Sequence, residues 1–218
     1  MLLCPSMMCA NGGELANEVR RLDAAGADVF HCDVMDGSFV PNFALGLEDV
    51  KAIRAATERL VDVHLMVENP SHVIELFCEA GADIVYIHPE SERYTTKTLS
   101  RIRALGKSAG LAINPDTPLV SVRDMLSYCD YVMVMTVNPG FAGQSFVDFT
   151  ESKIEELVGI KAQFGYRLII DGSCSPERIR RFSAMGVDGF VLGTSALFNK
   201  GISYAEALGR LRRGELFD

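Results

Sequence analysis

Short apolar stretches alternate along the chain with longer stretches in which apolar residues recur every three to four positions. The short stretches are rich in β-branched residues, which is typical of strands. Eight of them are predicted, at 2–8, 28–35, 60–67, 83–88, 107–114, 130–137, 167–171 and 188–193. The periodic segments predict eight helices, at 13–25, 47–56, 71–80, 96–105, 119–129, 146–164, 176–185 and 204–213.

Regular alternation of strands and helices favours βαβ units and therefore a parallel sheet. Eight such units in 218 residues favour closure of the sheet into a (β/α)8 TIM barrel. An open doubly wound sheet is the alternative, but it normally uses fewer units and carries G-x-G-x-x-G after its first strand, which is missing here. Because no linker, low-complexity block or charge run interrupts the pattern, we expect one domain over residues 1–218.

A four-residue pattern recurs before three of the predicted strands. It reads Ala-Gly-Ala-Asp at 25–28 and 80–83, and Met-Gly-Val-Asp at 185–188. In each copy the glycine follows a helical segment, where a left-handed residue ends many helices. The repeat therefore predicts a reused helix-to-strand turn and not a catalytic feature.

Charge and cysteine content narrow the class of protein. The net charge is −8 and the sequence pI about 5.1, which disfavours nucleic acid as a partner. A bound phosphate would then depend on local backbone N–H groups. No apolar run approaches the roughly 20 residues that span a bilayer, and residues 1–8 are too short for a signal peptide. The six scattered cysteines lack a C-x-x-C pair, so we expect reduced thiols and a cytoplasmic protein with no membrane partner.

Polar residues end nearly every predicted strand, and in this fold the active site lies at those ends. Because side chains alternate along a strand, His31 shares a face with Asp33, and equivalent positions are taken by His64 and Asp171. Two histidines and two aspartates at one barrel mouth suit a divalent metal with nitrogen and oxygen ligands. Any one of them alone would be read as a rim residue or a helix cap, so the prediction depends on their occurring together.

Three glycine-containing loops follow the last three strands. They are 138–144, Asp171-Gly172-Ser173 and Gly193-Thr194-Ser195. Glycine lets backbone N–H groups approach an anion, and the loops after strands seven and eight often hold phosphate in this fold. Three ordinary strand-to-helix turns are the alternative.

These motifs resemble the ribulose-phosphate 3-epimerase family along nearly the whole chain. The matching stretches are 5–8, 31–37 with 39–42, 64–67, 114–118, 135–141, 143–146 and Asp171-Gly172. The resemblance implies a TIM barrel of the ribulose-phosphate-binding type, an isomerase activity and a homo-oligomer. It also implies one divalent metal ion (Zn, Mn, Fe, Co or Mg), held by His31, Asp33, His64 and Asp171. In that scheme Asp33 and Asp171 also exchange the substrate proton.

The resemblance also implies the residues that contact a ketose phosphate. They are Ser6, Met35, Met66, His88, Met135, Asn138, Gly140, Phe141, Ala142, Gly143, Gln144, Gly172, Ser173, Gly193, Thr194 and Ser195. Inversion at a carbon beside a ketone requires proton removal from one face and proton return to the other, which two opposed carboxyl groups can perform. A divalent cation would stabilise the enediolate that forms.

Within the family the chain looks closer to the branch that converts D-allulose 6-phosphate to D-fructose 6-phosphate. Enzymes acting on D-ribulose 5-phosphate usually carry two glycines after the strand-seven aspartate, whereas here Gly172 is followed by Ser173 and Cys174. The segments 88–90 and 193–199 point the same way. The pentulose remains the alternative substrate.

Two other functions, one catalytic and one not, fit the sequence less well. A sugar-phosphate lyase or decarboxylase of this fold commonly needs a lysine at the reacting centre, in the pattern Asp-x-Lys-x-x-Asp. Met35 takes that place here, and no predicted strand ends in lysine. A non-catalytic sugar-phosphate binder would need the phosphate loops but not the paired aspartates.

Overall fold

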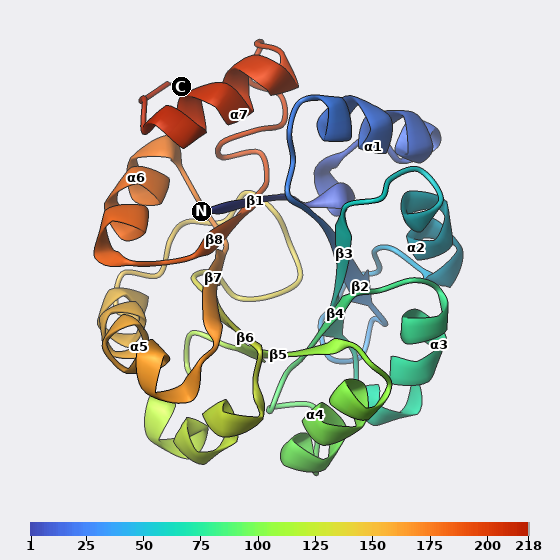
Figure 1. Cartoon of the computed structure of the whole chain (residues 1–218), viewed down its shortest axis with the longest axis vertical. Helices are drawn as coiled ribbons and strands as arrows, with labels where there is room; N and C mark the ends of the chain where they lie inside the picture. The colour runs from blue at the N-terminus through green and yellow to red at the C-terminus, as the bar shows by residue number, and fades with distance from the viewer. Residues whose placement is uncertain (218) are drawn as a thin grey trace.

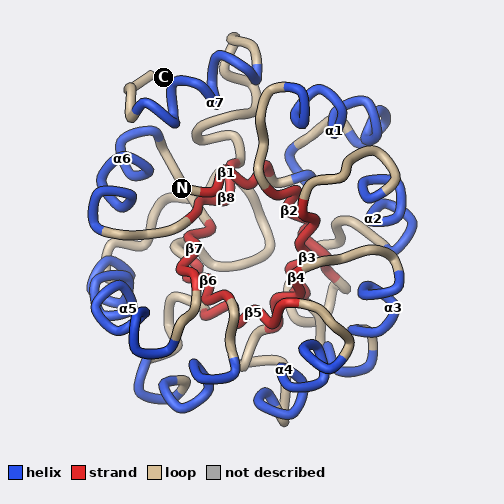
Figure 2. Tube along the Cα trace, in the orientation of Figure 1, coloured by secondary structure: helices blue, strands red, loops and turns tan. Residues whose placement is uncertain are grey.

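The structure, a computed structural model, describes residues 1–217 as a ring of eight parallel strands enclosed by helices (Figures 1 and 2). The strands are β1 (Leu2–Pro5), β2 (Val29–Met35), β3 (Leu60–Met66), β4 (Ile84–Ile87), β5 (Ser108–Ile113), β6 (Tyr131–Met135), β7 (Arg167–Asp171) and β8 (Gly189–Leu192). The predicted (β/α)8 TIM barrel is confirmed.

Neighbouring strands pair in the order β1-β8-β7-β6-β5-β4-β3-β2. The ring is completed between β1 and β2, where Ser6 and His31 form a parallel bridge and the Asp28 N–H donates to the Leu3 carbonyl at 3.0 Å. With both edges joined, backbone donors and acceptors find partners all round the barrel.

An outer layer of helices covers the strands. Its α-helices are α1 (Leu15–Ala24), α2 (Leu47–Arg54), α3 (Ile74–Glu79), α4 (Thr95–Ala104), α5 (Thr150–Phe164), α6 (Pro176–Met185) and α7 (Tyr204–Arg213). The 3-10 helices in the loops are η1 (Met7–Cys9), η2 (Gly12–Glu14), η3 (Pro70–His72), η4 (Leu119–Ser121) and η5 (Arg123–Tyr128). Because helices cover one face of each strand and the barrel interior the other, most strand residues are buried.

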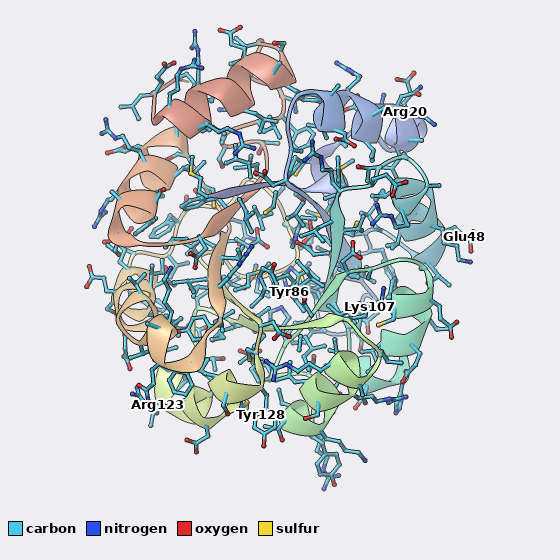
Figure 3. The ribbon with its side chains drawn as sticks, viewed as in Figure 1. Arg20, Glu48, Tyr86, Lys107, Arg123 and Tyr128 are labelled. Carbon is cyan, nitrogen blue, oxygen red and sulfur yellow. The ribbon has the colours of Figure 1, made fainter. Side chains whose placement is uncertain are left out.

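A second apolar cluster fills the inside of the barrel. It consists of Cys4, Val29, Ile84, Tyr86, Ala112, Tyr131, Met133, Met135, Ile169 and Val191. Figure 3 shows Tyr86 within the ring of strands, whereas Arg20 and Glu48 lie at the periphery. The barrel interior is therefore a packed core and not a pore.

The helix predicted at 119–129 is present only as two 3-10 helices, η4 and η5, and not as one α-helix. Val120 and Val122 are β-branched, and the Ser121 and Ser127 hydroxyls donate to the carbonyls of Pro118 and Asp124. Such side chains disfavour a regular α-helix and compete for its backbone groups.

The predicted helix at 146–164 begins later, at Thr150 in α5. The Val147 N–H donates to the Thr136 carbonyl at 2.9 Å, which keeps 146–149 attached to the end of β6. A tertiary hydrogen bond has displaced the helix start. The predicted helices 176–185 and 204–213 agree with α6 and α7 at both ends.

The repeated turn is confirmed as a structural device at the amino ends of the strands. Its glycines are left-handed, with φ of 92°, 108° and 119° at Gly26, Gly81 and Gly186. Each aspartate accepts a backbone N–H from a neighbouring strand, in the pairs Leu3 to Asp28, Val61 to Asp83 and Leu168 to Asp188. Each also forms an ion pair, with Arg212, Arg54 and Lys161 respectively. The turn joins strand, strand and helix at the face opposite the site.

All six cysteines are free thiols. None of the helices in residues 1–217 is long and apolar enough to cross a membrane.

Gly110 is predicted to be required for barrel packing. A Cβ placed there would lie 2.3 Å from the ring of Tyr86, which is 1% exposed. We expect Gly110→Ala to lower the free energy of unfolding by about 1–3 kcal/mol in urea denaturation. Gly159→Ala is the matched control, because nothing lies within 4 Å of a Cβ at that position in α5. That change should raise stability by about 0.5–1 kcal/mol. Equal effects of the two substitutions would contradict this account of the packing.

Candidate active site

Four predicted ligands meet at the carboxyl end of the barrel. His31 and Asp33 come from β2, His64 from β3, and Asp171 from the last position of β7. One ligand atom from each lies within 4.8 Å of the others. The register explains this, because Asp33 is paired with His64 across β2 and β3. Residues at matched depth in neighbouring strands point to the same space.

The atoms of this His/Asp cluster converge on one point. His31 Nε2 lies 3.2 Å from Asp33 Oδ1 and 3.8 Å from Asp171 Oδ2. His64 Nδ1 lies 3.4 and 3.5 Å from the same two oxygens. Both imidazoles are fully buried, and His64 Nδ1 makes no hydrogen bond in the described structure. A buried nitrogen facing two carboxylate oxygens suits a divalent cation, so the cluster could hold one.

Asp62 contacts His31 on the side of the ring that faces away from the cluster. The sequence analysis did not predict this residue. Its Oδ1 lies 2.6 Å from His31 Nδ1, and the residue is 2% exposed. When His31 is neutral, a carboxylate at this nitrogen keeps its one proton on Nδ1, so the Nε2 lone pair faces the cluster, as is common for metal-binding histidines. The signal was available, because Asp62 shares a strand face with His64 and Met66.

Burial and charge act against each other in the cluster. Burial alone would raise the pKa of Asp33, but the nearby His31 and His64 hold that pKa far below its usual range. Burial alone would lower the pKa of His31, but Asp62 and Asp33 raise it well above its usual value. A metal ion must therefore displace a proton from His31, so its affinity should weaken as the pH falls.

His88 lies one layer behind His64 and is not among the residues that line the pocket. Its Nε2 is 2.8 Å from His64 Nε2, and its Nδ1 is 3.2 Å from Glu90 Oε2. Phe39 packs on the ring at 4.9 Å between centroids. Burial lowers the pKa of the fully buried His88 to about 4, so this imidazole is neutral at pH 7.

A pocket with an empty volume of about 570 Å³ opens above the cluster. Apart from His88, every residue expected to contact the substrate lines it, together with Asp33 and Asp171. Further lining residues are Met8, Cys9, Val137, Pro139, Cys174 and Val191. The three methionines Met35, Met66 and Met135 are buried, which makes part of the wall apolar.

Ser6 is bonded to one of the cluster carboxylates. Its hydroxyl donates to Asp33 Oδ2 at 2.6 Å, while Asp33 Oδ1 faces the two histidines. The Asp33 side chain is only 6% exposed, compared with 15% for Asp171. The two carboxylates therefore differ in their access to the pocket.

The loop after β7 has the turned backbone predicted for an anion site. Gly172 has φ 115°, and a Cβ there would lie 2.7 Å from Val137, so only glycine fits. Ser173 has φ 48°, which is unusual for a residue with a side chain. Arg178 Nη1 donates to the Ser173 carbonyl at 3.1 Å and to its hydroxyl at 3.2 Å. This guanidinium brings local positive charge that the sequence reasoning did not predict.

The glycine-rich loop after β6 is braced over the pocket. Gln144 Nε2 donates to the carbonyls of Asn138 and Phe141 at 2.6 and 2.8 Å. Asn42 Nδ2 donates to the Gly140 carbonyl at 2.7 Å, which ties this loop to the one after β2. Phe141 is 51% exposed at the rim.

Asp62→Asn is predicted to weaken divalent-metal binding by about tenfold, because it removes the charge that stabilises His31 as a ligand. Competition with a chromophoric chelator would measure the affinity. Asp116→Asn is the control, since Asp116 is exposed and lies outside the cluster. Unchanged affinity in Asp62→Asn would show that His31 is not held in this way.

Comparison with known proteins places the chain in a family. The model of the ribulose-phosphate 3 epimerase family matches residues 2–198. A curated ribulose-phosphate 3-epimerase from Synechocystis is 40% identical, and the match covers 99% of this chain and 94% of the relative. One from Escherichia coli is 38% identical, and the match covers 91% of this chain and 89% of the relative. A solved 3-hexulose-6-phosphate synthase superposes with a TM-score of 0.69 at 16% identity, covering 99% of this chain and all of that one, which supports the barrel fold alone. Members of the matched family bind a divalent metal. The chain therefore belongs to the ribulose-phosphate 3-epimerase family, whose named members are isomerases.

Proposed function

We propose that this enzyme inverts the configuration at C3 of a ketose phosphate, with Asp33 and Asp171 as its two acid/base groups. The observation that carries the proposal is the placement of these carboxyl groups around one buried cluster. Asp33 belongs to β2 and Asp171 to β7, with β1 and β8 between them in the ring of eight strands. Two carboxyl groups on separate arcs of the barrel can reach opposite faces of one substrate carbon.

The two carboxyl groups share the proton transfer. Asp33 is ionised in its buried setting, so it can accept the proton from C3. Asp171, which lies at the pocket surface, returns a proton to the other face, and the roles reverse for the opposite epimer. A divalent cation held by the His/Asp cluster would stabilise negative charge on the substrate oxygens during this transfer.

The remaining pocket residues orient the substrate and exclude water. The phosphate is proposed to lie against the turned backbone of Gly172 and Ser173 and against the loop Gly193-Thr194-Ser195. The buried methionines Met35, Met66 and Met135 would cover the reacting carbons, which limits access of bulk water to the proton in transit. The Arg178 guanidinium behind Ser173 would offset part of the phosphate charge.

We propose D-allulose 6-phosphate as the preferred substrate. Support comes from Ser173, whose side chain replaces the second glycine usual in pentulose enzymes and is held by Arg178. This hydroxyl can shift the position at which a phosphate rests. D-ribulose 5-phosphate is the second candidate, favoured by a curated Arabidopsis relative, 37% identical, which is named a ribulose-5-phosphate-3-epimerase.

Turnover of both substrates tests the function directly. We expect C3 epimerisation with a higher kcat/KM for D-allulose 6-phosphate, and we expect chelation of the metal to abolish it. Asp171→Asn should lower kcat by about 10²–10⁴-fold, whereas Asp116→Asn should leave it unchanged. A preference for D-ribulose 5-phosphate would retain the mechanism and reject the substrate assignment. No turnover of either by metal-loaded enzyme would reject the function.

Ser173→Gly is predicted to shift the ratio of kcat/KM values towards D-ribulose 5-phosphate by about tenfold, because it removes the hydroxyl beside the phosphate. Steady-state kinetics on both substrates would measure the shift. Ser183→Ala, within α6, is the control and should leave the ratio unchanged. Ser175 does not serve, because its side chain caps the amino end of α6. An unchanged ratio in Ser173→Gly would show that this side chain does not select the substrate.

A further inference from the structure

A line of hydrogen-bonded polar groups runs from the buried His/Asp cluster into the loops after β4 and β5, where it ends at Glu90, whose side chain is 22% exposed. His64 Nε2 meets His88 Nε2 at 2.8 Å, and His88 Nδ1 meets Glu90 Oε2 at 3.2 Å. The centroids of the two imidazoles are 5.0 Å apart. This is about the distance between the two Nε2 atoms plus the distance from each Nε2 to the centre of its own ring. The rings therefore meet edge to edge, as an N–H···N hydrogen bond requires.

The groups at the far end of this line decide which atom donates and which accepts in each of its hydrogen bonds. Glu90 Oε1 accepts the Asn114 N–H at 3.1 Å and the hydroxyl of Thr117. Burial alone would raise the pKa of Glu90, but its bonds to His88 and Thr117 lower it, so the group is ionised and can only accept. His88 must then carry its proton on Nδ1, which leaves Nε2 as an acceptor for His64 Nε2–H.

For neutral His64, the form that binds a metal ion, the consequence is the tautomer with a lone pair on Nδ1. That is the atom which faces Asp33 and Asp171 without a hydrogen bond. The opposite direction would place a proton on Nδ1 and close the position to a cation. The acceptor at residue 90 thus sets the chemistry of an atom two imidazole rings away.

The end of the line is held in place by a lysine from a distant helix. Lys153 of α5 is 8% exposed, and its Nζ donates to the carbonyls of Asn114, Pro115 and Thr117 at 2.8, 2.9 and 2.6 Å. These bonds fix the loop that presents the Asn114 N–H and the Thr117 hydroxyl to Glu90. Burial of a charged ammonium group is costly unless the group is hydrogen-bonded, and the three carbonyls supply those bonds.

We propose that Glu90 is a positioning residue that acts through His88 to keep His64 in the tautomer whose Nδ1 is free to bind the metal. This role deepens the proposed function and rests on it, since it concerns the metal site of that function. It does not require Glu90 or His88 to touch the substrate.

Glu90→Gln tests the proposal because an amide has one accepting end and one donating end. The Asn114 N–H cannot change its polarity, whereas an imidazole can move its proton between nitrogens. The Gln oxygen should therefore face Asn114 and its NH₂ group should face His88, reversing the line. We expect zinc affinity of the full-length protein to fall by about 10–100-fold in chelator competition.

Glu92→Gln is the matched control. Glu92 is a buried glutamate two positions further along the same loop, and it accepts the backbone N–H groups of Ser71 and Tyr94 without touching the His64–His88 line. Its zinc affinity should stay within about threefold of wild type. An equal loss in both variants would overturn the proposal, because it would indicate a general effect of charge removal.

The second readout is the position of the ring protons, taken from ¹⁵N NMR of the full chain with and without zinc. The chain has only four histidines, which makes assignment practical. We expect the His88 proton on Nδ1 in wild type and on Nε2 in metal-free Glu90→Gln. A merely structural role for Glu90 would leave this proton where it is, and that result would overturn the proposal.

Thr117→Val covers the case in which Glu90→Gln folds poorly. It removes one donor to Glu90 but keeps the carboxylate, so His88 should retain its Nδ1 proton and zinc affinity should change less than threefold, or about 0.6 kcal/mol. A loss as large as that expected for Glu90→Gln would overturn the proposal. If wild type bound no divalent metal, the proposed function would fall, whereas the His88 proton in Glu90→Gln would still decide this inference.

Discussion

The structure depends on the convergence of two imidazole nitrogens and two carboxylate oxygens at one buried point. Ligand atoms of His31, Asp33, His64 and Asp171 lie within 4.8 Å of one another, and three of the four residues are buried. Such charges are expensive to bury unless they are matched by protons, hydrogen bonds or a cation. The barrel satisfies this constraint with a layer of partners behind the cluster, namely Asp62, His88 and Ser6.

These partners fix the orientation of the side chains that form the cluster. Asp62 directs His31, and the line through His88 to Glu90 directs His64, so each imidazole presents one nitrogen to the cluster. The histidines are supported from different strands and loops. A metal site of this kind is preorganised, because its ligands are oriented before a cation arrives.

The two ends of the barrel divide stability from chemistry. At the amino ends of the strands, Asp28, Asp83 and Asp188 bond to neighbouring backbones and pair with basic residues of the helix layer. At the carboxyl ends, Asp33 and Asp171 are left facing the pocket. The same residue type thus has two roles, according to which end of a strand it occupies, as the barrel fold commonly requires.

The alternation of apolar and periodic segments was sufficient to predict the barrel, because eight βα units leave few other ways to bury a parallel sheet. Side-chain alternation along each strand, together with the family resemblance, was sufficient to predict that His31, Asp33, His64 and Asp171 meet. The local pattern did not predict that 119–129 forms 3-10 helices, nor that the helix predicted at 146 starts later, because the Val147 N–H donates to the Thr136 carbonyl just after β6. The support given by Asp62, Glu90, Lys153 and Arg178 was decided only by tertiary structure. Those contacts join loops and helices distant in the chain, and no local periodicity records which carboxylate will lie behind which imidazole.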